Sequence, residues 1–189
     1  MKWKNTESDI SATSLSELNE DLSLNEIIYL LNKTANMPFI VCPEVVKRKI
    51  VTHLMREKSE LGGLLVGKVV SLDDLSSGIL GIIIVDSVES TEFYSTSVSL
   101  TMGAKVWQDA NKCISTKHFV VGWYHSHPNL GAFFSGVDRK TQEDFFNAPY
   151  HVGLVVDPIR DEEKWFVGPK CLEVLEENII ESLNEFSMV

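Results

Sequence analysis

Cysteine is scarce in this sequence. Its 189 residues include three cysteines, Cys42, Cys113 and Cys171, and no two of them form a C-x-x-C pair. An odd number of widely spaced cysteines does not suit a disulfide framework, so we predict reduced and mostly buried thiols. Reduced thiols are typical of cytoplasmic proteins, and we therefore expect a cytoplasmic location.

Long apolar runs are missing as well. The longest clean run near the middle of the chain covers only residues 82–85, whereas about 20 apolar residues are needed to cross a bilayer. Residues 1–5 are not followed by an apolar stretch. We therefore expect neither a signal peptide nor a membrane partner.

Positive charge is in the minority. The chain has 17 lysines and arginines against 27 aspartates and glutamates, which gives a formal net charge of −10. Nucleic-acid phosphates would be repelled by such a surface, so we expect no nucleic-acid partner. The apolar fraction of 44% is ordinary for a globular domain, and the length suits one domain with an appendage.

The most informative stretch starts at His125. It has the form His-x-His, then seven residues, then Ser-x-x-Asp, and it ends at Asp138. Residues 118–124 are predicted to form a buried strand that runs into His125. Because alternate side chains of a strand point to the same side, His125 and His127 should face the same way. Pro128 then ends the strand, because it has no N–H to donate.

A helix should begin near Ser135. Ser135 and Asp138 have the spacing of a helix start, which places Asp138 in the first helical turn. There its carboxylate can turn back toward His125 and His127. Taken singly, these residues would be ordinary packed histidines and a helix cap. Together, two imidazole nitrogens, one carboxylate oxygen and an open fourth position are typical of a catalytic site, so we predict a single zinc ion (Zn2+) in each chain.

This stretch resembles the JAMM motif of the MPN-plus metalloproteases, which are also called JAB or Mov34 domains. Residues 122–128 (Gly-Trp-Tyr-His-Ser-His-Pro) and 135–138 (Ser-Gly-Val-Asp), followed by Thr141 and Gln142, are close to the eukaryotic deubiquitinase members. The motif is highly specific, so it carries most of the functional expectation.

Two further elements extend the resemblance. The family's Glu-x-x-Gly-Leu-Leu-x-Gly element is matched by residues 60–67, and residues 151–158 are similar to its central strand. The resemblance covers about residues 38–170. It implies an α/β fold, a mixed β-sheet flanked by helices that is known as the cytidine-deaminase-like JAB/MPN fold. The alternation of predicted strands and helices favours the same architecture.

Hydrolysis by a zinc-activated water also needs a carboxylate that accepts a proton and passes it to the leaving amine. No glutamate lies between the predicted ligands, as it does in HExxH proteases. The resemblance assigns this role to Glu60, while Glu57 is a second candidate on spacing alone. It also implies that Ser135 donates a hydrogen bond to the oxyanion, and this role competes with helix capping for one hydroxyl.

The resemblance implies a substrate class. The expected reaction is hydrolysis of the amide after the C-terminus of ubiquitin or a ubiquitin-like protein, in deconjugation of its conjugates or in precursor processing. A compact chain of this kind resembles prokaryotic members that act beside ubiquitin-like conjugation systems, including those for antiviral defence against phages. E1-like and E2-like proteins would then be partners.

Two other hypotheses stay open. In one, the same site is an amidohydrolase that acts on a sulfur-carrier protein or another small peptide adduct. In the other, the chain is a non-catalytic MPN scaffold, although such members usually lose ligands and all of them are kept here. Neighbouring genes for E1-like, E2-like and ubiquitin-like proteins would discriminate best.

We divide the chain into a polar leader with a short helix, residues 1–37, and a JAMM/MPN metalloprotease domain, residues 38–189. Residues 1–22 are polar and are predicted to be flexible. Ser23 is predicted to cap the short helix, which either packs on the domain or docks a partner. The apolar residues of this helix are Leu24, Ile27, Ile28, Leu30 and Leu31.

The remaining elements follow from the apolar pattern. Strands are predicted at 39–42, 64–70, 79–88, 151–156 and 165–167. Helices are predicted from Pro43 to about Lys58, at 104–114, at 136–146 and from Glu173 to Phe186. The first of these helices should turn inward Val45, Val46, Ile50, Leu54 and Met55. A polar turn at 71–78 and a loop at 89–99 complete the prediction, and the loop is a candidate rim for the substrate.

Five aromatic or histidine side chains are assigned supporting roles. His53 lies on the first predicted helix and is expected to have a packing or surface role. His118 and His151 are expected to be structural, because the zinc set is already filled. Phe133 and Phe134 lie in the metal loop, where they either anchor the loop in the core or line a channel for the substrate tail.

Overall fold

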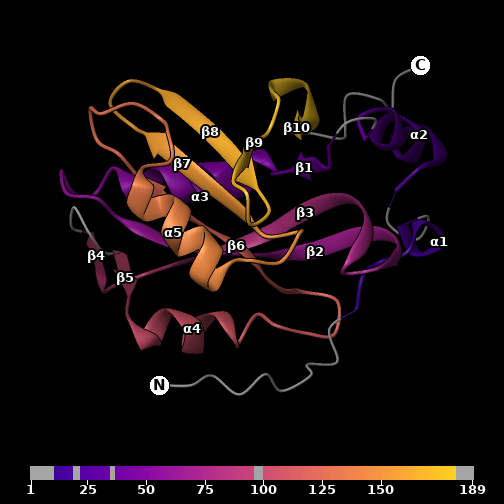
Figure 1. Cartoon of the computed structure of the whole chain (residues 1–189), viewed down its shortest axis with the longest axis horizontal. Helices are drawn as coiled ribbons and strands as arrows, with labels where there is room; N and C mark the ends of the chain where they lie inside the picture. Colours follow the sequence, from indigo (N-terminus) through magenta and orange to yellow (C-terminus); the bar gives the residue numbers. More distant parts are fainter. Residues whose placement is uncertain (1–10, 19–21, 35–36, 96–99, 182–189) are drawn as a thin grey trace.

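A mixed β-sheet runs through the molecule. The computed structural model describes residues 11–18, 22–34, 37–95 and 100–181 (Figure 1). Eight strands form the main sheet in the order β10-β1-β3-β2-β6-β7-β8-β9. Their bounds are β1 Phe39–Val41, β2 Gly62–Asp74, β3 Ser77–Glu89, β6 Phe119–Ser126, β7 Val152–Asp157, β8 Glu162–Val167, β9 Leu172–Glu173 and β10 Ile179–Ile180.

The sheet combines parallel and antiparallel neighbours. Strand β1 is parallel to β3 and β10, and β6 is parallel to β7, whereas the other adjacent pairs are antiparallel. The other elements are α1 Leu15–Leu18, α2 Leu24–Asn32, α3 Glu44–Leu54, the hairpin β4 Phe93–Ser95 with β5 Leu100–Met102, α4 Ala104–Ala110, α5 Gly136–Phe145 and the 3-10 helix η1 Glu176–Asn178. Within the described ranges, no helix is long and apolar enough to cross a membrane. The α/β architecture predicted from the sequence is confirmed.

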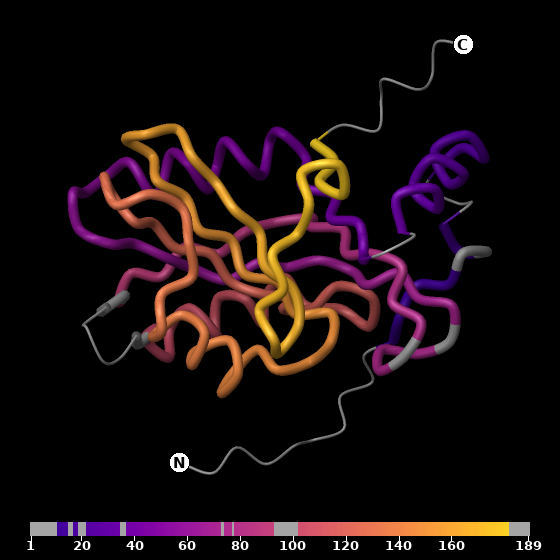
Figure 2. Tube along the Cα trace, turned by 45° about the horizontal axis from the view of Figure 1, so that its top comes forward, coloured from indigo at the N-terminus to yellow at the C-terminus, as the bar shows by residue number. Residues whose placement is uncertain are grey.

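Helices cover both faces of the sheet. Figure 2 shows α3 on one side and α4 with α5 on the other. On β7, the side chains of Val152, Leu154 and Val156 join the core beneath α3, whereas Val155 joins the core on the α4 side. Every residue of β7 is buried, and a strand covered on both faces is apolar on both. The central strands are therefore firmly held, and they include the strand that carries the candidate site.

Helix α2 packs on the edge of the sheet. As the sequence predicted, Ser23 caps it in a capping box with Glu26. Ile27 and Leu30 are buried in a cluster that includes Phe39 of β1. Of the two hypotheses for this helix, packing on the domain is the one that the structure shows.

Part of the polar leader also contacts the sheet. Thr13 forms a parallel bridge with Val70 of β2, and Leu18 of α1 is 1% exposed. Residues 1–10 and 19–21, on which the prediction of flexibility partly rests, lie outside the described residues. The division of the chain after residue 37 stays a prediction.

Some apolar side chains of the predicted helices are exposed. Val45 (67%) and Met55 (65%) were expected to face inward from α3 but are exposed, and Leu24 (67%) and Ile28 (49%) of α2 are exposed as well. The buried residues of α3 are Val46, Ile50, His53 and Leu54, and Val45 and Met55 lie one position off this stripe. Helix α3 also ends at Leu54 instead of near Lys58.

The hairpin of β2 and β3 is longer than predicted. A polar turn was expected at 71–78, but β2 continues to Asp74 and β3 begins at Ser77. The Asp74 carboxylate accepts the backbone N–H of Ser76 at 2.8 Å, so a side chain closes a tight turn. The polar residues on either side of this turn belong to the strands, although their composition is typical of a loop. The predicted loop at 89–99 includes β4, and residues 96–99 lie outside the described part.

The predicted C-terminal helix from Glu173 to Phe186 is wrong. The described part of this segment forms β9, η1 and β10. The backbone N–H of Val174 donates to the Trp165 carbonyl at 2.8 Å, and β10 pairs with β1 in parallel. Hydrogen bonds to the edges of β8 and β1 therefore outweigh the helical spacing of the apolar residues. The adjacent isoleucines of β10 also favour a strand, because β-branched residues are common in strands. Residues 182–186 lie outside the described chain.

Candidate metal centre

Strand β6 places two histidines at its end. His125 lies opposite Gly62 of β2 and Val155 of β7, so a strand is bonded to it on either side. The backbone N–H of His127 donates to the Val156 carbonyl at 2.9 Å, just beyond the strand. His125 is 0% and His127 4% exposed. Both rings are therefore held in a buried, rigid frame.

Helix α5 adds a carboxylate from its first turn. Ser135 caps the helix, and Asp138 is the reciprocal member of its capping box. The Asp138 carboxylate is 3.2 Å from Nε2 of His125 and 3.5 Å from Nε2 of His127, through different oxygens. The two Nε2 atoms are 3.2 Å apart. Three candidate ligand atoms thus lie within 4.8 Å of one another.

Local electrostatics keep two of these groups in the forms that bind metals. Burial lowers the pKa of His127, the neighbouring His125 adds to the effect, and the charges of Asp138 and Glu60 oppose it. Burial would raise the pKa of Asp138, but hydrogen bonds from His125 and Ser135 lower it to about 2. At neutral pH Asp138 is a carboxylate and His127 a neutral ring, as metal ligation requires.

Ser135 is half-buried at the rim of this group. Its hydroxyl oxygen accepts the backbone N–H of Asp138 at 3.2 Å. A hydroxyl has one donor and two acceptor positions, so capping uses an acceptor position and leaves the O–H to donate elsewhere. The two roles that the sequence set in competition are therefore compatible.

Glu60 and Glu57 lie in different surroundings. Glu60 directly precedes Leu61, whose backbone N–H donates to the Ser126 hydroxyl at 3.0 Å. This contact fixes the chain beside the metal strand, and the charge of Glu60 reaches His127. Glu57 is exposed and accepts a hydrogen bond from Ser59 at 3.0 Å. Of these two glutamates, Glu60 is the one whose charge acts on His127.

The two phenylalanines of the metal loop have different roles. Phe134 is 5% exposed and stacks on Phe166 with ring centroids 4.1 Å apart. A Cβ added at Gly153 would lie 2.3 Å from the Phe134 ring, so the absent side chain makes room for this anchor. Phe133 is 46% exposed, with its ring centroid 4.9 Å from that of His127. Phe134 anchors the loop, and Phe133 borders the site.

The sequence interpretation missed Asp157, at the end of β7. Its buried carboxylate accepts backbone N–H groups of Asn129 at 2.9 Å, Gly131 at 2.7 Å and Ile159 at 3.0 Å. It therefore holds the metal loop against the next loop. The available signal was an acidic residue directly after a wholly apolar strand, where an unsolvated carboxylate needs donors.

The other histidines lie apart from this group. The Nδ1 atom of buried His53 is 2.9 Å from the Tyr124 hydroxyl, and Nδ1 of His151 accepts the Ala148 N–H at 3.1 Å. Over the described ranges, the single cluster with metal-ligand spacing is His125, His127 and Asp138. His118 is not part of it.

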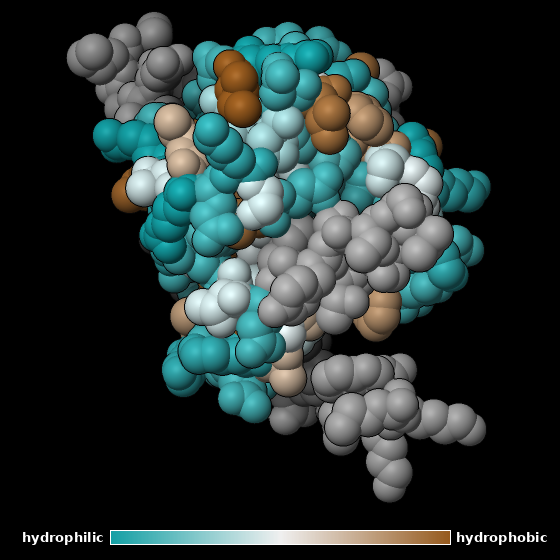
Figure 3. Space-filling model, turned by 90° about the vertical axis from the view of Figure 1, so that its left-hand side faces the viewer, coloured by the Kyte–Doolittle hydropathy of each residue, from teal (hydrophilic) through white to brown (hydrophobic). Residues whose placement is uncertain are grey.

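The surface around the site is mixed. The loops after β6 and β7 lie at the left-hand end of Figure 1, which faces the viewer in Figure 3. That view shows separate hydrophobic spots on a mainly hydrophilic surface. Three residues of these loops are exposed and apolar, namely Leu130 (59%), Phe133 (46%) and Ile159 (64%). These exposed apolar side chains are thus scattered over the surface, as is ordinary for a folded protein.

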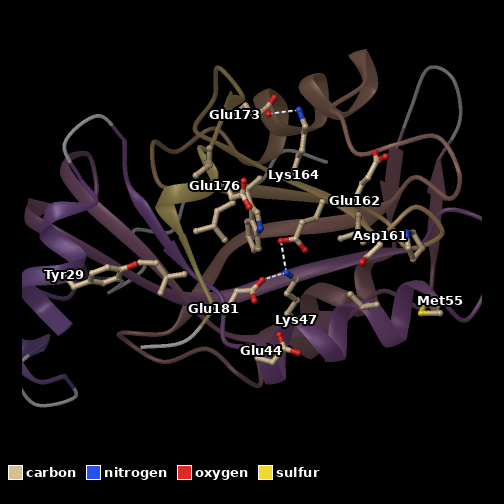
Figure 4. A pocket seen from close by; sticks show the side chains of 18 residues that line it. Tyr29, Glu44, Lys47, Met55, Asp161, Glu162, Lys164, Glu173, Glu176 and Glu181 are labelled. Carbon is tan, nitrogen blue, oxygen red and sulfur yellow. Dashed lines mark hydrogen bonds and ion pairs between the residues drawn. The ribbon is translucent and has the colours of Figure 1, made fainter. Parts of the chain in front are cut away.

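A groove lies on the α3 face of the sheet (Figure 4). This groove of about 1190 Å³ runs between α3 and the strands β8 to β10, and none of the three candidate ligands lines it. Lys47 lies in it and pairs with Glu163 at 3.0 Å and with Glu181. Since His125 stacks on Trp123 in the opposite core, the groove is separate from the candidate metal centre.

Comparisons with known proteins point to one family. The family described as "JAB1/Mov34/MPN/PAD-1 ubiquitin protease" matches residues 36–148. COP9 signalosome complex subunit 5 of Caenorhabditis elegans is 35% identical over 119 residues, which is 59% of this chain and 30% of that protein. The 26S proteasome non-ATPase regulatory subunit 14 of Drosophila melanogaster is 35% identical over 106 residues, 53% of this chain and 32% of that protein.

A third relative is similar over a shorter stretch. The 26S proteasome regulatory subunit rpn11 of Schizosaccharomyces pombe is 43% identical over 70 residues, 34% of this chain and 23% of that protein. The chain thus spans at most about a third of the length of these relatives. The family match covers more than half of the chain, and its range includes the three residues gathered at the end of β6 and the start of α5, His125, His127 and Asp138. The chain therefore belongs to the JAB1/Mov34/MPN/PAD-1 family, the JAMM/MPN proteins.

Proposed function

We propose that this protein is a zinc-dependent isopeptidase that hydrolyses the amide after the C-terminus of ubiquitin or a ubiquitin-like protein. The observation that carries the proposal is the convergence of His125, His127 and Asp138, with their ligand atoms within 4.8 Å. Two imidazole nitrogens and one carboxylate leave one position of a tetrahedral site open, which is the pattern of catalytic zinc.

The three residues fit a zinc ion by the chemistry of their donor atoms. Both histidines direct Nε2 to the same place as the carboxylate oxygens of Asp138. Nitrogen and carboxylate oxygen are ordinary zinc ligands, and the three come from a strand end and a capped helix that fix their directions. When bound there, zinc would supply Lewis acidity that brings the pKa of a water from about 15.7 toward 7.

Glu60 would accept and return the proton. Glu60 is half-buried and its charge acts on His127. The hydrogen bond from the Leu61 N–H to the Ser126 hydroxyl supports the backbone directly after it. General acid–base groups of this kind typically contribute about 100- to 10,000-fold. The O–H of Ser135, which capping does not use, would donate to the oxygen of the scissile carbonyl as negative charge develops on it.

The substrate class comes from the family. Its description names a ubiquitin protease, and the relatives are subunits of the COP9 signalosome and of the proteasome. The tail of a ubiquitin-like protein is an extended peptide, which can add to an open strand edge. The small sheet of β4 and β5 is separate from the main sheet, and we propose that the tail adds to one of its edges. The exposed Phe133 and Leu130 would contact the body of the partner.

The cellular setting is a further part of the proposal. We place the reaction in the cytoplasm, beside E1-like and E2-like proteins of a bacterial ubiquitin-like conjugation system that serves antiviral defence. The support for a reducing compartment is the three free thiols, Cys42, Cys113 and Cys171. Neighbouring genes would test this setting.

The experiment combines metal analysis with two defined substrates. We would purify the wild type and a His125→Ala, His127→Ala double variant, measure zinc per chain, and follow cleavage of lysine-linked diubiquitin and of a linear ubiquitin fusion. We expect about one zinc per wild-type chain, cleavage that stops with a chelator and returns with zinc, and neither property in the double variant. Full zinc in the double variant would refute the site. Zinc binding without cleavage of any ubiquitin-like conjugate would favour a scaffold.

A further inference from the structure

Gln142 lies four residues after Asp138 on α5 and is 0% exposed. Residues four apart share one face of a helix, so the helix that presents Asp138 also buries this amide beside the metal strand. Its Oε1 accepts a hydrogen bond of 2.7 Å from Nε1 of Trp123. The bond joins two side chains that are both completely buried, where an unpaired polar group would be costly.

The orientation of the Gln142 amide is fixed by its other end. Its Nε2 donates to the carbonyl oxygens of Phe146 at 3.1 Å, His151 at 3.1 Å and Gly168 at 3.4 Å. Carbonyl oxygens accept only, and an indole N–H donates only. The amide can therefore satisfy its neighbours in one orientation, with Oε1 toward Trp123.

Trp123 in turn supports a candidate ligand. Its ring stacks on that of His125, with centroids 4.6 Å apart and planes 7° apart. It also stacks on Phe146, at 5.8 Å and 15°, and packs against the tilted ring of Phe134 at 5.6 Å. Aromatic rings thus surround the indole, and the bond to Gln142 selects which edge of the indole faces α5. A rotated indole would present a different surface to His125.

We infer that Gln142 is a positioning residue that orients His125 through Trp123, which deepens the proposed function and rests on it. Helix α5 would then provide one metal ligand directly, Asp138, and would orient a second ligand, His125, indirectly through Gln142 and Trp123. Partners that orient metal ligands typically change metal affinity by about 10- to 100-fold when they are removed.

The test uses Gln142→Leu, which removes the amide, and Trp123→Phe, which keeps an aromatic ring but lacks the N–H. Ile50→Ala is the matched control, because it removes a buried side chain from the opposite core beneath α3. Two quantities are measured, namely zinc affinity by chelator competition and, in metal-free protein, the ring-current shift of the His125 ring protons by NMR. Melting temperatures are recorded for all variants.

We expect Gln142→Leu and Trp123→Phe each to weaken zinc binding about 10- to 100-fold. The double variant should bind zinc no more weakly than the single variant with the lower zinc affinity, because both substitutions break the same hydrogen bond. Gln142→Leu should also lose the ring-current shift of His125. Ile50→Ala should lower the melting temperature and leave zinc affinity and shift unchanged.

Two results would overturn the inference: a wild-type ring-current shift in Gln142→Leu, or additive losses of zinc affinity in the double variant. Failure of the proposed function looks different. If the wild type bound no zinc, that proposal would fall, while loss of the shift in metal-free Gln142→Leu would still establish that Gln142 orients His125.

Discussion

The Asp138 carboxylate accepts the backbone N–H of Ser135 at 2.6 Å and lies 3.2 Å from Nε2 of His125 through its other oxygen. One side chain therefore completes a helix cap and offers a metal ligand. The two roles can be separated by substitution, because an amide oxygen can accept the same backbone N–H but carries no charge.

Asp138→Asn should keep the reciprocal bond of the capping box and lose most of the zinc. Asp138→Ala should lose both that bond and the zinc, while the Ser135 hydroxyl still accepts the backbone N–H of residue 138. In the metal-free form the Ala variant should be less stable than the Asn variant by about 1 kcal/mol, the typical net contribution of one hydrogen bond. Zinc content and thermal unfolding of metal-free protein measure the two effects. An Asn variant with full zinc would remove Asp138 from the ligand set.

Glu60→Gln should retain zinc and fold but lose isopeptide hydrolysis by at least about 100-fold, because an amide cannot accept the proton. Glu57→Gln is the matched control, and its rate of hydrolysis should stay within a few-fold of the wild type. Glu57 is exposed and accepts a hydrogen bond from Ser59. Both variants are assayed on diubiquitin, with zinc measured in parallel. An inactive Glu57→Gln with intact zinc would put Glu57 in the role of Glu60.

Ser135→Gly should separate capping from catalysis. Glycine is tolerated at a helix N-cap at a cost of only a few tenths of a kcal/mol relative to serine, whereas alanine costs about 1 kcal/mol. Ser135→Gly and Ser135→Ala both lack the O–H, so both should lose about 100- to 1000-fold in kcat. If Ser135→Gly is stable and fully active, the hydroxyl serves only as a cap.

Asp157 should make stability depend on pH in the acid range. Burial would raise its pKa, but the backbone N–H groups of Gly131, Asn129, Ile159 and Arg160 lower it from 3.8 to about 2. A lowered pKa stabilises the folded state above the unfolded value and loses that effect as pH falls through the folded value. The contribution should therefore disappear between about pH 4 and pH 2.

Asp157→Asn is the comparison for this effect. We would record the melting temperature of both proteins from neutral pH down to pH 2. The difference between them should be largest near neutral pH and shrink across the window, and the subtraction cancels Asp138, which titrates in both. A difference that stays constant with pH would contradict the assignment.

The N-terminal helix offers a stability test with an internal control. Leu30→Ala should destabilise the fold by about 2–5 kcal/mol, because it leaves a cavity in a buried cluster. Leu30 is 1% exposed, whereas Leu24 of the same helix is 67% exposed, so Leu24→Ala should change little. Equal effects of the two variants would mean that α2 does not pack on the domain in solution.

Sequence reasoning succeeded where the determining contacts are local. Alternation along β6 and the Ser135–Asp138 spacing are properties of neighbouring residues, and they were sufficient to predict that the two histidines and the carboxylate lie together. Asp157 and Gln142 were missed as supporting residues, because their partners are remote in sequence. Asp157 accepts hydrogen bonds from the backbone of Asn129 and Gly131, and Gln142 accepts one from the indole of Trp123.

The errors have the same origin. The apolar pattern after Glu173 fits a helical period, yet β8 and β1 offer backbone partners that no local pattern reveals. Val45 and Met55 were wrongly predicted to face inward. The boundaries of α3 and the side that it buries depend on the sheet beneath the helix, which the local sequence does not reveal.

Two of the candidate ligands, His127 and Asp138, follow the end of β6 in a loop and in the first turn of α5, whereas His125 lies in β6 itself, between β2 and β7. Opening of this loop and the first turn of α5 would withdraw two ligands from an ion while the sheet stays paired, since proteins open in local cooperative units. Amide hydrogen exchange should then slow on zinc addition over residues 127–142 and remain unchanged in α3. Exchange of the metal with the medium would be governed by this partial opening and not by the lifetime of the whole fold.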